Sequence, residues 1–187
     1  MRAFVYFAGP LLAATLFFTA PGQAQPIDEA RVGLTAQGFG GWAPDFEQGA
    51  GINLELLVKS PDFLSAIGSP RPLIGANIAT DGDATSQFYA GFEWKTYFAP
   101  RFFAAGMLGG AIHNGETDPF DPIADANRAN TTQFLGCRAL FRLGADIGYD
   151  ITSRVSASIH WSHISNAGLC DENEGLDNLG ARIGYRF

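Results

Sequence analysis

A histidine, a serine and an aspartate near the end of the sequence have the residue types of a hydrolytic triad. His163 and Ser165 lie two residues apart in the stretch HISNAG, and Asp177 follows shortly after. In such a triad the histidine is the general base that activates the serine hydroxyl, and the carboxylate orients the imidazole. The residues therefore predict a nucleophilic hydrolase, provided that the fold brings the three side chains together.

The elements that must position these residues are strands. Apolar and polar residues alternate with a period of two, and Gly-rich or polar turns separate the alternating runs. No helical periodicity of comparable quality is present. Eight strands are predicted, at about 30–42, 50–60, 72–80, 86–98, 101–113, 134–150, 153–166 and 177–187.

Two all-β architectures fit eight amphipathic strands. A soluble sandwich would turn the apolar faces inward, whereas an outer-membrane barrel would turn them to lipid and enclose the charges. The strands are long enough for tilted membrane spans. The final strand ends in Phe187, which resembles the C-terminal signature of bacterial outer-membrane barrels. We therefore predict an eight-stranded antiparallel transmembrane β-barrel, with extracellular loops at about 43–49, 81–85, 114–133 and 167–176.

Strand parity places the three candidate residues on the outside of this barrel. His163 and Ser165 share the apolar face of 153–166, and Asp177 begins the apolar face of 177–187. A polar trio on a lipid-facing wall costs stability, which favours a functional role. The site would face lipid because its substrate is a lipid. The alternative is that these residues only contact head groups and water at the rim.

The N-terminal segment and the composition further limit the classes of function that this protein can have. Residues 1–24 combine Arg2, an apolar run and a small-residue site, which predicts a cleaved signal peptide and a barrel domain over 25–187. The net charge of −7 argues against nucleic-acid binding. Cys137 and Cys170 reach an oxidising compartment, where either a disulfide or two unpaired thiols would be compatible with the sequence. No zinc, P-loop or dinucleotide pattern is present.

The opposite strand faces predict a charged interior. Arg138, Arg142, Arg182 and Arg186 are expected to form an interior charge network, and His160 is expected to pair there with a carboxylate. His113 is expected at a strand end, with a structural role at the rim or in a turn.

The segment HISNAGLCDENEGLD resembles the signature of the PagL-type lipid A 3-O-deacylases, which are outer-membrane acyloxyacyl hydrolases. The stretches RPLIGANIATDGDATSQFYAGFEWK and GGAIHNG also resemble sequences grouped with this family, so the resemblance spans most of the mature chain. The matching positions are His163, Ser165, Asn166, Ala167, Gly168, Asn173, Gly175 and Asp177.

The resemblance implies hydrolysis of the ester-linked acyl chain at the 3-position of lipid A, without a metal or other cofactor. Ser165 would be the nucleophile, His163 the base and Asp177 the orienting acid. Asn166 and the backbone near Gly168, with Asn173 in support, would form the oxyanion hole. The best-known members carry glutamate at the position of Asp177, whose side chain is one methylene shorter.

The resemblance also implies a bacterial outer-membrane protein that acts on lipopolysaccharide as a monomer or homodimer. Two other functions fit the residues. One is a non-catalytic barrel with a structural or adhesive role, and the other is an esterase that acts on a different lipid.

Overall fold

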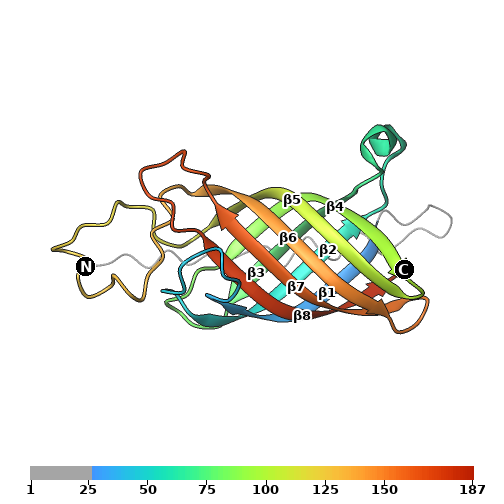
Figure 1. The fold of residues 1–187 in the computed structure, drawn as a ribbon, viewed down its shortest axis with the longest axis horizontal. Coiled ribbons are helices and arrows are strands. Elements are labelled where there is room, and N and C mark those ends of the chain that lie inside the picture. Colours follow the sequence, from blue (N-terminus) through green and yellow to red (C-terminus); the bar gives the residue numbers. More distant parts are fainter. Residues whose placement is uncertain (1–26) are drawn as a thin grey trace, which may run out of the picture.

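The structure is a computed structural model that describes residues 27–187, and its strands form one closed antiparallel barrel (Figure 1). Each strand pairs with the next, and β1 pairs with β8 to close the sheet. The predicted signal peptide, residues 1–24, lies outside the described residues. The strands are β1 (Ile27–Gln37), β2 (Gly49–Val58), β3 (Arg71–Ala79), β4 (Gln87–Ala99), β5 (Phe102–His113), β6 (Ala139–Asp150), β7 (Val155–Ser165) and β8 (Leu176–Arg186).

All eight predicted strands are present in the predicted order, and two of their boundaries differ from the prediction by five residues. β1 ends at Gln37 instead of residue 42, because Gly38 has a positive φ of 75° and the chain turns away. β6 begins at Ala139 instead of residue 134, because Gly136 has a φ of 71° and the Cys137 N–H bonds back to Leu135 at 2.8 Å. Positive φ values of this kind interrupt extended pairing.

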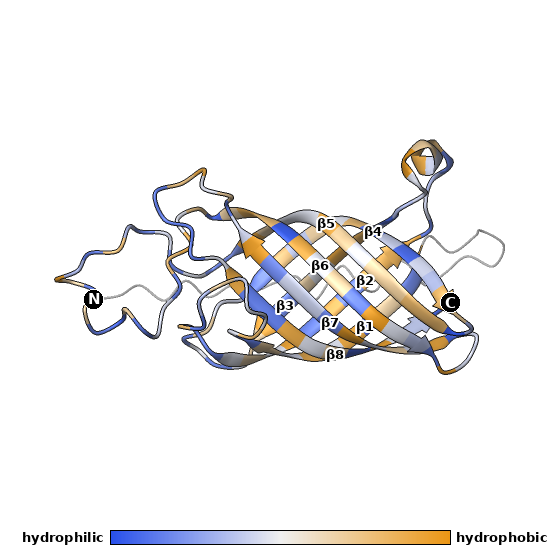
Figure 2. Ribbon diagram, viewed as in Figure 1, coloured by the Kyte–Doolittle hydropathy of each residue, from blue (hydrophilic) through white to orange (hydrophobic). Residues whose placement is uncertain are grey.

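The exposed wall of the barrel is apolar, which excludes the sandwich. Hydrophobic and hydrophilic residues alternate along the strands in Figure 2. The large apolar side chains point out, whereas a sandwich would bury them between two sheets. Exposed examples from four strands are Val32, Leu34, Ile52, Leu54, Leu56, Phe141, Leu143, Ile147, Leu179 and Ile183.

The interior is a network of buried ion pairs. Arg31 contacts Glu29 at 2.7 Å and Glu55 at 3.1 Å, and it also pairs with Glu93. Arg182 contacts Glu55 at 3.1 Å and pairs with Asp146. The opposite charges offset one another where water is excluded, so the narrow lumen is filled by paired side chains.

The predicted interior arginines divide into two groups. Arg142 and Arg182 are buried inside, Arg186 pairs with Asp150 at 2.5 Å, and His160 contacts Asp146 at 3.3 Å as expected. Arg138 is different, because it lies before β6 and is exposed. Its guanidinium donates to the carbonyls of His113 at 2.8 Å and Gly115 at 3.1 Å, so it supports a loop.

The connections at the two ends of the barrel differ in length. One end, on the left of Figure 1, carries four loops: 38–48, 80–86, 114–138 and 166–175. The other end carries the C-terminus, two short turns and the connection 59–70, which contains the 3-10 helix η1 (Asp62–Ile67). Within residues 27–187, no helix has the length and apolar character needed to cross a membrane.

Candidate active site

The pairing of β7 with β8 brings His163 and Asp177 together. The two residues are direct partners in the antiparallel register, and His163 Nδ1 lies 2.8 Å from Asp177 Oδ1. An imidazole that donates from Nδ1 to a carboxylate keeps Nε2 free to accept a proton. Ser165 lies two residues further along β7 on the same outward face.

The structure brings only two of the three predicted triad residues into hydrogen-bonding contact. Among residues 27–187, no hydrogen bond joins Ser165 to His163. Contacts of this kind are often long in a free enzyme and tighten when substrate binds. Ser165 and His163 therefore share one face of β7 without a hydrogen bond between their side chains in this structure.

Asp177 is buried by a loop that the sequence analysis did not connect to the site. The backbone N–H groups of Trp42 and Ala43 donate to Asp177 Oδ2 at 2.8 and 3.0 Å. The aspartate is only 1 % exposed, although its parity points outward. Loop 38–48 therefore covers the carboxylate and fixes its orientation by holding the oxygen that does not face His163.

Close packing at a glycine makes this cover possible. A Cβ atom at Gly40 would lie 2.6 Å from Asp177 Oδ2 and 2.4 Å from the indole nitrogen of Trp161. Any side chain at residue 40 would therefore push the loop off the carboxylate. The prediction of a strand up to residue 42 concealed this contact.

Two tryptophans frame the imidazole. The ring of Trp42 meets His163 edge-on at 5.6 Å between centroids, and Trp161 stacks parallel to it at 6.3 Å. The two indoles also contact each other at 5.1 Å. These rings restrict the rotation of His163 and exclude water from one side of it.

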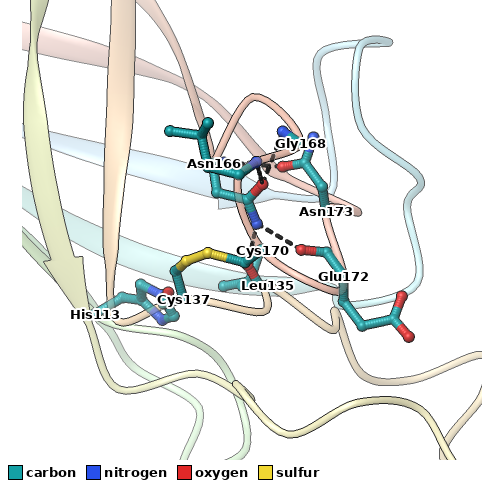
Figure 3. The surroundings of a disulfide bond; sticks show 9 residues. His113, Leu135, Cys137, Asn166, Gly168, Cys170, Glu172 and Asn173 are labelled. Carbon is teal, nitrogen blue, oxygen red and sulfur yellow. Dashed lines mark hydrogen bonds between the residues drawn. A yellow bond between two sulfur atoms is a disulfide. The ribbon is translucent and has the colours of Figure 1, made fainter.

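The predicted oxyanion residues form a hydrogen-bonded turn directly after Ser165 (Figure 3). The Asn166 amide donates to the carbonyls of Leu135 and Glu172, and its oxygen accepts the Gly168 N–H at 2.8 Å. Asn173 accepts the Asn166 N–H at 2.8 Å. The side chain of Asn166 is thus fully engaged within the loop in this conformation.

The turn also contains two consecutive left-handed residues. Ala167 has a φ of 56° and Gly168 a φ of 79°. The N–H of Ala167 has no hydrogen-bond acceptor among the described residues, unlike that of Gly168. This backbone donor is therefore not engaged by a bond within the turn.

A disulfide joins Cys137 and Cys170 beneath the same turn (Figure 3). The Cα atoms are 6.1 Å apart, and the bridge spans 33 residues of sequence. It links the end of loop 114–138 to loop 166–175. His113 supports this region through a contact of 2.6 Å between Nε2 and the Cys137 carbonyl, in agreement with a structural role.

Two partly desolvated carboxylates connect the loops around the site. Glu174 accepts the N–H of Phe134, and Glu47 accepts the N–H of Thr85, each at 2.6 Å. Burial raises the pKa of both carboxyls above their ordinary value. Gln133 adds a third connection, because its amide donates to the carbonyls of Pro44 at 2.9 Å and Gly175 at 2.6 Å.

Removal of the disulfide should lower stability without unfolding the barrel. In the chain-entropy account, a bridge that closes 33 residues stabilises by roughly 3–4 kcal/mol. We expect the Cys137→Ser/Cys170→Ser double variant to unfold at lower urea concentration in detergent micelles while keeping its heat-modifiable gel mobility. The wild-type chain with reductant should resemble the variant. Identical unfolding curves with and without reductant would show that the bridge contributes nothing.

Within residues 27–187, no three or more His, Cys, Asp or Glu side chains are grouped so that they could hold a metal ion.

The closed sheet, the apolar exterior and the charged interior define the class of the protein as a small outer-membrane β-barrel. Residues 71–186, which are more than half of the chain, match the family described as PagL, lipid A 3-O-deacylase. The chain belongs to this family, whose members are lipid A deacylases. A search of the curated proteins finds no match.

Solved structures agree with the fold. The crystal structure of the outer-membrane enzyme PagL is similar, with a TM-score of 0.63 at 16% identity, covering 85% of this chain and 99% of that chain. Neisserial surface protein A is similar with a TM-score of 0.50 at 8% identity, covering 86% of this chain and 96% of that chain. At these identities the likeness concerns the fold alone.

Proposed function

We propose that this protein is a serine hydrolase that removes the ester-linked 3-O acyl chain of lipid A in the outer leaflet of the outer membrane. The observation that carries the proposal is the 2.8 Å contact between His163 and Asp177 on the lipid-facing wall, with Ser165 next along the same face. The family membership supplies the substrate, and the geometry supports the roles of the residues.

The chemistry follows from these positions. Ser165 Oγ attacks the acyl carbonyl while His163 Nε2 takes the hydroxyl proton, and Asp177 stabilises the resulting imidazolium. The imidazolium then gives this proton to the 3-oxygen of the sugar as the ester bond breaks, which releases the sugar 3-hydroxyl and leaves an acyl-serine. Water, activated by the same histidine, hydrolyses that ester and releases the fatty acid.

The turn after Ser165 is where we place the oxyanion hole. The free N–H of Ala167 is one donor, and Asn166 and Asn173 hold the turn in the conformation that presents it. Gly168 N–H and the Asn166 amide can contribute once their bonds within the loop are exchanged for bonds to the oxyanion. Donors fixed before the reaction stabilise the charge that develops in the transition state.

The surface beside Ser165 suits an acyl chain. An apolar hollow of about 400 Å³ is lined by Gly110, Phe141 and Leu169, among others, and Phe141 is the β6 partner of Ser165. A chain in this hollow would replace lipid contacts with protein contacts. All three proposed triad residues belong to the same chain, so a monomer would contain the complete site. The proposed mechanism uses no cofactor.

The decisive experiment is mass spectrometry of lipid A from Gram-negative cells that lack a 3-O-deacylase of their own. Cells that express the wild-type chain should lose one 3-hydroxyacyl group, and cells that express Ser165→Ala should lose none. Heat-modifiable gel mobility would confirm that both proteins are folded. Unchanged lipid A with fatty acid released from phospholipids would indicate a different ester substrate. No change in either lipid would indicate a non-catalytic barrel.

A further inference from the structure

The connection between β2 and β3 is much longer than the other turns at its end of the barrel. It spans residues 59–70 and contains η1, whereas residues 100–101 and 151–154 suffice for the other two turns. Periplasmic turns of outer-membrane barrels are usually short. The extra residues in this connection therefore require an explanation beyond joining two strands.

The helix in this connection exposes apolar side chains. Phe63 is 79 % exposed and Ile67 is 56 % exposed, while Leu64 is buried. Gly68 caps the end of η1, and its φ of 88° allows its N–H to bond to the Ser65 carbonyl at 3.1 Å. The connection is thus a formed structure that presents a phenylalanine and an isoleucine to its surroundings.

The helix is attached to the lipid-facing side of the barrel. The indole N–H of Trp94, on the outward face of β4, donates to the Ile67 carbonyl at 2.8 Å. A Cβ atom at Gly68 would lie 3.4 Å from the Trp94 ring, so the chain packs directly against the indole. In Figure 1, η1 stands outside the barrel wall, near the end that carries the C-terminus.

The apolar surface of η1 continues the aromatic surface of that end. Exposed aromatic side chains lie at this end of the barrel, as in the aromatic girdles at which outer-membrane barrels meet the membrane interface. Those nearest along β4 and β5 are Phe92, Trp94, Phe98 and Phe102. η1, which carries Phe63 and Ile67, stands outside the wall at the same end (Figure 1).

We propose that η1 is an interfacial anchor that inserts Phe63 and Ile67 among the phospholipids of the inner leaflet. Its exposed apolar residues and its link to Trp94 place it where the lipid-facing wall ends. Interfacial segments of this kind bury an apolar face at the boundary between head groups and acyl chains. The exposed Lys59 lies beside the segment, where its ammonium group can contact lipid phosphates.

The small size of the surface argues for lipid over a protein partner. A stable protein interface buries about 800 Å² on each side, and it does so over roughly 20–30 residues. η1 offers two large exposed apolar side chains on six residues. Lipid contact needs no such area, because each apolar side chain leaves water independently.

The test is the environment of a fluorophore at residue 63. A Phe63→Cys variant would be labelled with an environment-sensitive dye. Labelling would be done without reductant, so that the disulfide between Cys137 and Cys170 stays intact. The labelled full chain would then be reconstituted in phosphatidylethanolamine–phosphatidylglycerol vesicles. Ile123→Cys is the matched aqueous control, since Ile123 is a 91 % exposed apolar residue in loop 114–138. Phe98→Cys on the outer wall is the lipid control.

We expect the emission of the dye at residue 63 to shift to shorter wavelength than at residue 123 and to approach that at residue 98. A doxyl-labelled lipid should quench it more strongly with the label near the head group than near the chain end. Emission equal to that at residue 123 would overturn the proposal. A blue shift without lipid quenching would also overturn it, because protein would then cover the residue. The readout is independent of lipid A deacylation.

Discussion

An Asp177→Asn variant should deacylate lipid A about 10³–10⁴ times more slowly than the wild type while remaining a folded barrel. The two N–H groups of Trp42 and Ala43 require an acceptor at one side of residue 177. An asparagine will therefore turn its carbonyl oxygen toward the loop and its NH₂ group toward His163. A donor facing Nδ1 places the imidazole proton on Nε2, which can then no longer accept the proton of Ser165.

The measurement is the initial rate of fatty-acid release from lipid A in mixed micelles, with heat-modifiable mobility as the test of folding. Asp171→Asn is the matched control, because Asp171 is an exposed aspartate in the same loop 166–175, and its rate should stay close to that of the wild type. Asp177→Glu tests the length of the side chain. The glutamate keeps a carboxylate that can accept from His163 and from the loop, but its extra methylene must fit into the closely packed space beside Gly40. We therefore expect a rate between those of the wild type and Asp177→Asn. An Asp177→Asn rate within tenfold of wild type would remove Asp177 from the mechanism.

Replacement of Arg182 by methionine should destabilise the barrel by roughly 3–5 kcal/mol, the cost of breaking a buried ion pair from one side. Arg182 is fully buried, contacts Glu55 at 3.1 Å and pairs with Asp146. Its loss leaves both carboxylates with only part of their compensating charge. Arg31 still reaches Glu55 at 3.1 Å and Asp146 at 3.7 Å, but it already neutralises Glu29 and Glu93.

Urea unfolding in detergent micelles, followed by tryptophan fluorescence, measures this effect. Arg154→Met is the matched control, since Arg154 is exposed in the turn 151–154 and its replacement should change stability by about 0.5 kcal/mol or less. A Glu55→Gln substitution added to Arg182→Met should restore part of the loss, because it removes one of the two uncompensated charges. An unfolding midpoint equal to that of the control would show that the interior network does not depend on Arg182.

The two-residue periodicity of the sequence was sufficient for the architecture. It located all eight strands, separated the apolar wall from the charged interior, and put His160, Arg142 and Arg182 inside. The same periodicity assigned His163, Ser165 and Asp177 to one face, because parity is a local property of an extended chain. The resemblance carried by HISNAG and the residues after it indicated the family that the comparison shows.

The contacts between loops were decided by the tertiary structure alone. Loop 38–48 has no periodicity that would connect it to Asp177, yet its backbone holds that carboxylate across a separation of 135 residues. The contact depends on the register of β1 against β8 and on the close approach at Gly40, and neither can be inferred from residue types. Likewise, strand parity assigned Arg138 to the interior, but the turn at Gly136 starts β6 later and leaves it outside. Local patterns determine which face a side chain takes, whereas closure of the barrel determines which distant loop covers that face.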